Sequence, residues 1–119
     1  MMISILCGLT VNPPFIEIGS VAALDEFLAR ANGSAAVLFK HSDTCGVSAR
    51  AYAEMSKLRE PVGLIRVQKV RAVSDEIEKR WNVDHESPQV VIIRDGRAIW
   101  DASHFQVKAQ QVESALESV

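Results

Sequence analysis

The sequence has 119 residues, of which 48% are hydrophobic and 24% are charged, and its formal net charge is −2. This length is enough to close one hydrophobic core but not two, so we expect a single domain. Acidic and basic residues are interspersed along the chain instead of collected in blocks, which argues against nucleic acid as a partner.

The first 14 residues are apolar but lack the features of an export signal. They have no basic start, their apolar run is short, and Leu6 precedes Cys7 where a cleavage site would have a small residue. No other segment approaches the roughly 20 apolar residues of a membrane helix. We therefore expect residues 1–14 to be an N-terminal extension and residues 15–119 to form the domain of a soluble, cytoplasmic protein with no membrane partner.

The two cysteines, Cys7 and Cys45, are far apart in the sequence. Without an export signal, a structural disulfide between them is not expected. Cys7 lies in the apolar extension without a motif, so packing or an incidental thiol is a better interpretation than a resolving role. No pair of Cys or His residues has the spacing of metal ligands, so we expect no metal site.

The first half of the domain predicts two helices on either side of a buried strand. Ser20 can cap a first helix, which Asn32-Gly33 would end. A continuous apolar run over residues 35–40 predicts a strand buried on both faces, with polar residues resuming at His41. Apolar side chains at helical spacing predict a second helix over residues 45–58.

The second half of the domain predicts two further inner strands, a hairpin and two helices. Residues 62–68 read as a strand, and a helix capped by Ser74 should follow it. Two strand-like runs joined at Asp95-Gly96 predict an antiparallel hairpin, and a final amphipathic helix carries Val107 and Gln111 near one face. Strands separated by helices favour parallel pairing, so the sequence predicts an α/β fold with a mixed central sheet and helices on both faces.

The stretch FKHSDTCGVSARAY places Cys45 directly after the predicted inner strand and at the start of a helix. Free backbone N–H groups and the positive end of the helix dipole favour the thiolate there, so Cys45 is expected to be a nucleophile. Ser48 lies on the same side of the first turn, and its hydroxyl could donate a hydrogen bond to the sulfur. Because serine cannot form a disulfide, a mixed disulfide on Cys45 would persist until an outside thiol attacks it.

The stretch HESPQVVI precedes the third inner strand and contains Ser87 and Pro88. In a sheet of this kind, that loop packs against the first turn of the cysteine helix. If the Ser87-Pro88 peptide bond is cis, the loop would offer the Ser87 backbone to an extended substrate, and Pro88 would cover the sulfur and discourage metal binding. His85 and Glu86 could border a thiol-binding groove or form a solvated loop, and both interpretations stay open.

Residues beside Cys45 are secondary candidates for the site. His41 could favour the thiolate if it is protonated, or it could cap or bond a loop carbonyl. Thr44 and Gly46 flank the cysteine and are expected to contact the substrate. His104, at the end of the hairpin, is expected to be structural.

Two stretches, FKHSDTCGVS and VRAVSDEIEKRWNVDHESPQVVIIRDGRAIWDASH, together with their separation, resemble the monothiol bacilliredoxin family. The resemblance covers nearly everything from Phe15 onward and implies a thioredoxin-like three-layer fold with a C-terminal antiparallel hairpin. It further implies a Cys-x-x-Ser site without a bound cofactor. The sequence departs from the family at Gly46-Val47, where the family has Pro and Ile, and glycine loosens the first turn.

The resemblance also implies a reaction and its partners. Cys45 would attack the mixed disulfide of an S-thiolated client protein, release the reduced protein and carry bacillithiol, the low-molecular-weight thiol that serves as co-substrate. Glutathione or coenzyme A would need the same nucleophile, so the residues alone do not select the thiol. The alternative, from another class, is a thioredoxin-fold binding, adaptor or redox-sensing domain in which Cys45 does not cycle.

Overall fold

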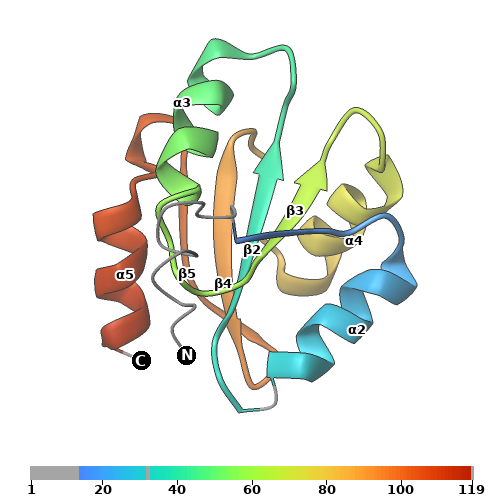
Figure 1. The fold of residues 1–119 in the computed structure, drawn as a ribbon. Coiled ribbons are helices and arrows are strands. Elements are labelled where there is room, and N and C mark those ends of the chain that lie inside the picture. The colour runs from blue at the N-terminus through green and yellow to red at the C-terminus, as the bar shows by residue number, and fades with distance from the viewer. Residues whose placement is uncertain (1–13, 32, 119) are drawn as a thin grey trace, which may run out of the picture.

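A five-stranded sheet forms the middle layer of the computed structural model, which describes residues 14–31 and 33–118. Figure 1 shows α3 and α5 on one face of this sheet and α2 and α4 on the other. The elements in chain order are β1 (Phe15–Glu17), α2 (Val21–Ala31), β2 (Ala36–His41), α3 (Gly46–Met55), β3 (Val62–Arg66), α4 (Arg71–Trp81), β4 (Gln89–Arg94), β5 (Arg97–Ser103), the 3-10 turn η1 (His104–Gln106) and α5 (Ala109–Glu117). The predicted extension, apart from Pro14, and Cys7 lie outside the described residues.

The strands follow the order β1-β3-β2-β4-β5. Strands β1 and β2 pair in parallel with β3, whereas β4 is antiparallel to both β2 and β5. The mixed sheet and the C-terminal antiparallel hairpin are therefore confirmed. Strand β1 was not predicted, because three residues are too few to show a period of two. The parallel pairing expected for helix-separated strands holds for β2 and β3 but not for β4.

Both faces of the sheet carry a hydrophobic core. Successive side chains of a strand point to opposite faces, and all six residues of β2 are buried. Val37 and Phe39 pack with residues of α3 and α5, whereas Ala36 and Leu38 pack with residues of α2 and α4. This arrangement confirms the three layers and explains why the run reads as continuously apolar. The strand also extends one residue beyond the prediction, to a buried His41.

Several capping and turn residues adopt the conformations predicted from the sequence. The Ser20 Oγ accepts a hydrogen bond from the Ala23 N–H at 3.1 Å, as an N-cap does. Gly33 has a φ of 91° just after α2, and the hairpin turn has φ values of 52° at Asp95 and 78° at Gly96. Positive φ at both central residues is what a two-residue type I′ turn requires.

Two helices differ in detail from the prediction. Helix α4 begins at Arg71, so the prediction that Ser74 caps it is wrong. Ser74 is a buried residue within the helix, and its hydroxyl lies 3.1 Å from the His85 Nδ1. On α5 the buried side chains include Ala109 and Val112, whereas Gln111 is exposed. Among the described residues, none of the helices is long and apolar enough to span a bilayer.

Candidate active site

Cys45 occupies the N-cap position of α3. Its backbone is extended, with φ −108° and ψ 125°, and its carbonyl accepts the Ala49 N–H at 3.0 Å, the first bond of the helix. Its side chain makes no capping hydrogen bond, is half-buried and is a free thiol. The first N–H groups of a helix have no partner within the helix. The partly exposed sulfur therefore lies at the end of the helix where the first N–H groups lack helical partners.

Ser48, three residues later, is fully buried and bonded away from the cysteine. Its Oγ lies 2.8 Å from the His41 Nδ1 and accepts the Ser42 N–H at 2.9 Å. Both partners belong to the end of β2 and the loop that follows it. The hydroxyl therefore connects the first turn of α3 to the strand before the cysteine.

The state of the His41 ring decides where the single Ser48 proton points. His41 is buried against the rings of Phe39 and Tyr52, and this burial lowers its pKa against the opposing effect of Asp43. The neutral ring places its Nε2 3.2 Å from the Asp43 Oδ1, so the proton is on Nε2 and Nδ1 accepts the Ser48 O–H. The expected hydrogen bond from Ser48 to the cysteine sulfur is therefore absent, and the lowered pKa also opposes a protonated His41.

Arg66 and Gln68, at the end of β3, bind the loop before Cys45. Neither was a candidate site residue from the sequence. The Gln68 side chain donates to the Ser42 Oγ at 2.8 Å and to the Thr44 Oγ1 at 3.0 Å, and it accepts the Asp43 N–H at 3.1 Å. Arg66 also binds Asp43, at 2.7 Å. Thr44 is exposed, and its hydroxyl is part of this network. The sequence did contain one indication of this role. Polar residues follow β3, and because β2 and β3 are parallel, these residues lie at the same end of the sheet as the cysteine loop.

The loop before β4 lies at the same end of the sheet as Cys45. The register pairs Lys40 of β2 with Gln89 of β4, so Pro88 stands beside the end of β2 that leads to Cys45. The Ser87-Pro88 peptide bond is cis, and the Pro88 carbonyl accepts the His104 N–H at 2.9 Å. The Ser87 Oγ is buried and has no hydrogen-bond partner within residues 14–31 and 33–118.

Two further candidates, Glu86 and Gly46, lie at the periphery of this end of the sheet. The Glu86 Oε1 lies 3.2 Å from the His104 Nε2, so His104 joins η1 to the loop before Pro88. Gly46 is exposed, and a Cβ added there would have no atom within 4 Å. The structure thus brings the predicted residues to one end of the sheet and gives Ser48 and His41 partners other than the sulfur.

A buried lysine behind the proline loop was also missed. Lys40 is 1% exposed, and its Nζ lies 3.2 Å from the His85 Nδ1, which also bonds the Ser74 hydroxyl at 3.1 Å. Burial lowers the pKa of Lys40, and the charges of Glu78 and Asp75 oppose this effect. Lys40 closes an apolar run, so its sequence position showed only the end of a strand. In the folded chain the contact with Lys40 holds His85, and with it the loop before Pro88, against β2.

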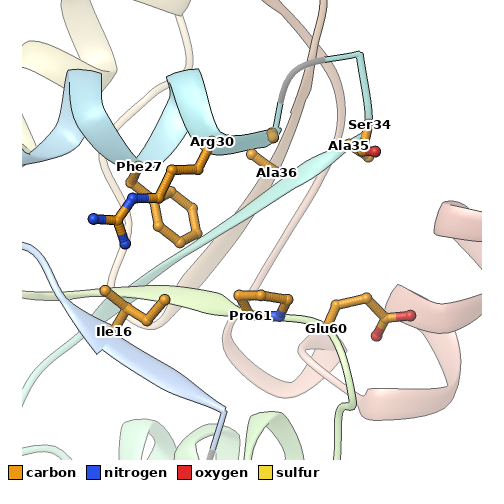
Figure 2. A pocket seen from close by; sticks show the side chains of 9 residues that line it. Ile16, Phe27, Arg30, Ser34, Ala35, Ala36, Glu60 and Pro61 are labelled. Atoms are coloured by element: carbon orange, nitrogen blue, oxygen red, sulfur yellow. The ribbon is translucent and has the colours of Figure 1, made fainter.

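The two ends of the sheet differ in character. A cavity of about 350 Å³ lies at the end opposite to Cys45, where apolar side chains such as Phe27, Ala36 and Pro61 line it (Figure 2). It contains none of the candidate residues. Within the described ranges, no group of three or more His, Cys, Asp or Glu side chains could hold a metal ion.

Comparisons with known proteins identify the family of the chain. The profile of the family described as "Monothiol bacilliredoxin BrxC" matches residues 16–112. The chain belongs to the monothiol bacilliredoxin family. The match to bacilliredoxins includes β2, the cysteine, the proline loop and the hairpin, and it places the chain among thiol oxidoreductases.

Solved structures show the thioredoxin fold. A candidate oxidoreductase with a thioredoxin fold is 30% identical, has a TM-score of 0.78, and the alignment covers 85% of this chain and 92% of that one. The thioredoxin of Fasciola hepatica has a TM-score of 0.71 at 13% identity, with 86% and 96% of the two chains covered. Poplar thioredoxin h has a TM-score of 0.68 at 16% identity, with 88% and 95% covered. The two thioredoxins show the fold alone.

Proposed function

We propose that this bacilliredoxin is a monothiol oxidoreductase that removes a low-molecular-weight thiol, bacillithiol, from mixed disulfides of client proteins. The observation that carries the proposal is the pairing of a free, half-buried Cys45 at a helix N-cap with a fully buried Ser48 in place of a second cysteine. A nucleophile without an internal resolving thiol suits transfer of a thiol cap, since the intermediate waits for an outside thiol. The choice of bacillithiol rests on the family.

The proposed reaction has two exchange steps. The Cys45 thiolate attacks the bacillithiol sulfur of the mixed disulfide, the bond between the two original sulfurs breaks, and the client leaves as a thiolate that takes up a proton. A second low-molecular-weight thiol, as thiolate, then attacks the cap on Cys45. This step releases the disulfide of the two small thiols and restores the Cys45 thiolate, so each step moves one electron pair between sulfurs and needs no bound cofactor.

The residues around Cys45 would support these steps by position. Unpaired N–H groups at the start of α3 stabilise negative charge on the sulfur. The Ser87 backbone, beside Pro88, is suited to hold an extended client segment through main-chain hydrogen bonds. Ser48 and His41 would act as positioning residues, because their contacts fix the loop that carries Cys45. Thr44 and Glu86 lie at the rim where a substrate would pass.

Intact mass spectrometry tests the proposal. The reduced protein is incubated with a model protein that carries bacillithiol, or glutathione in a parallel sample, on one cysteine. We expect the bacillithiol mass on Cys45 and the model protein as free thiol, with no transfer to Cys45→Ala, which keeps Cys7 as its only thiol. Transfer of both caps would indicate a generalist oxidoreductase. No transfer, while Cys45 can still be alkylated, would favour the binding or redox-sensing alternative.

A further inference from the structure

A second concave site lies beside the cysteine helix. A cavity of about 200 Å³ opens between α3 and η1, and its lining combines apolar and charged side chains. The residues that matter for its chemistry are Arg50, Glu54, His104, Phe105 and Lys108. None of them is among the candidates that the sequence analysis assigned to the cysteine site. We call this cavity the Arg50 pocket.

The Arg50 pocket is connected to the site through both of its walls. Arg50 follows Cys45 by five residues, a rise of about 7.5 Å along a helix. On the other wall, His104 donates its N–H to the Pro88 carbonyl at 2.9 Å and pairs with Glu86 at 3.2 Å. A thiol built from three residue-sized units spans roughly 10 Å when extended. This span exceeds the rise from Cys45 to Arg50, so we infer that a cap on the Cys45 sulfur can extend to the pocket.

The charges of the pocket favour an anion. Arg50 and Lys108 form no salt bridge with any residue in the described part of the chain. The carboxylate of Glu54 is already engaged, by Lys57 at 2.8 Å and by the Ala109 N–H at 2.8 Å, and these contacts lower its pKa. The charge of Lys108 also contributes to the lowered pKa of Glu54, which lines the same cavity. The lining therefore carries two cations and one carboxylate whose oxygens are already bonded elsewhere.

An aromatic ring completes the site. Phe105 keeps 61% of its surface exposed, although large apolar side chains are usually buried. The Arg50 guanidinium carbon lies 5.9 Å above the centre of this ring. Stacking of this kind holds the planar guanidinium in place, which suits bidentate binding of a carboxylate. The exposed face offers apolar surface to the carbon frame of the same ligand.

We propose that the Arg50 pocket binds the carboxylate end of the low-molecular-weight thiol carried by Cys45, an inference that rests on the function proposed above. The guanidinium of Arg50 and the ammonium of Lys108 pair with the carboxylate, and Phe105 packs against the stem of the ligand. The pocket therefore makes the enzyme select acidic thiols over neutral or cationic thiols of similar size.

Disulfides that differ in charge test the proposal. In a Cys7→Ala background, formation of the mixed disulfide on Cys45 is followed by intact mass with oxidised glutathione, which carries carboxylates, and with neutral hydroxyethyl disulfide. We expect Arg50→Gln to slow the reaction with oxidised glutathione by about three- to tenfold. The rate with hydroxyethyl disulfide should stay within about twofold, as should both rates in Lys79→Gln, a matched change on α4. Circular dichroism checks that each variant is folded.

The outcomes separate this proposal from the proposed function. If Arg50→Gln slows the reactions with both disulfides equally, Arg50 acts on the Cys45 sulfur and the proposed role of the pocket is overturned. If it slows neither reaction, the proposed role is overturned as well. Slowing that appears only with a thiolated client protein would assign the pocket to the client and also overturn the proposal. A wild-type protein that reacts with neither disulfide would overturn the pocket, whereas the proposed function fails only if bacillithiol is not transferred from the model protein to Cys45.

Discussion

The contact between Ser48 and His41 is the largest difference between the cysteine site predicted from the sequence and the site in the structure. The spacing of Ser48 from Cys45 suggested a hydrogen bond to the sulfur, but the hydroxyl is buried between the His41 ring and the Ser42 N–H. A serine proton can serve one acceptor at a time. The role of Ser48 is therefore to hold the cysteine loop against the end of β2.

Replacement of this serine should affect stability more than thiol reactivity. Ser48→Ala leaves the Ser42 N–H and the His41 Nδ1 buried without their partner, which should lower the free energy of unfolding by about 1–3 kcal/mol. Urea denaturation measures the loss, with exposed Ser114→Ala as the control. The rate of Cys45 alkylation across pH should be unchanged, and a slower rate would show that the hydroxyl does serve the sulfur.

His41 should make stability depend on pH. Because burial lowers its pKa, the folded protein binds fewer protons than the unfolded chain between that lowered pKa and about 6.5. The free energy of unfolding should therefore fall as the pH drops below about 6.5. Urea midpoints between pH 5 and 8 test this expectation. His41→Asn, which can still accept the Ser48 O–H, should show a shallower slope, and an equal slope would assign the dependence to other groups.

At the scale of elements, the start of α3 joins the fold to the chemistry. The strand β2 delivers the chain to this end of the sheet, Gln68 and Arg66 hold the intervening loop, and Cys45 caps the helix. Gly46 is the first helical residue, a position where proline is favoured because its missing N–H has no helical partner anyway. The extended backbone of Cys45 is also the conformation that a following proline requires.

Gly46→Pro should therefore stabilise the protein. An added Cβ at Gly46 meets no atom within 4 Å, and proline reduces the conformational freedom of the unfolded chain. We expect the free energy of unfolding to rise by about 0.4–1 kcal/mol, measured by urea denaturation. Gly33→Pro, at a φ of 91° that proline cannot adopt, should lower it. A destabilised Gly46→Pro would mean that the Gly46 N–H has a needed partner.

At the scale of the whole molecule, the sheet separates two cores and must pack closely on both faces. Gly63 lies on β3 between β1 and β2, and it faces the core formed with α2. A Cβ at this position would lie 2.6 Å from Ile18 Cδ1, 3.0 Å from Phe27 and 3.1 Å from Leu38. The absence of a side chain at Gly63 therefore lets α2 and the segment after β1 approach the sheet.

Gly63→Ala should destabilise the fold through overpacking. We expect a loss of about 1–3 kcal/mol in the free energy of unfolding, because three buried side chains would have to shift. Thermal and urea denaturation measure it, with Gly19→Ala as the matched control, since a Cβ at Gly19 meets nothing within 4 Å. A Gly63→Ala variant as stable as its control would show that the core around α2 is loosely packed.

Features that depend on neighbouring residues could be predicted from the sequence alone. The buried strand β2, the cap at Ser20, the Asp95-Gly96 turn and a cysteine at the start of a helix all follow from periodicity or turn chemistry over a few residues. The long block around Pro88 was specific enough to indicate the family, and with it the three-layer fold.

The partners of the buried polar groups, by contrast, depend on how distant parts of the chain pack together. Ser74 lies inside α4, where its hydroxyl contacts the His85 ring, and the buried Lys40 ammonium contacts the same ring. Strand β1 exists because β3 offers it an edge, and the antiparallel pairing of β4 places Pro88 near the cysteine end. These contacts join residues that are far apart in the chain, and such pairings leave no periodic or spacing signal in a single sequence.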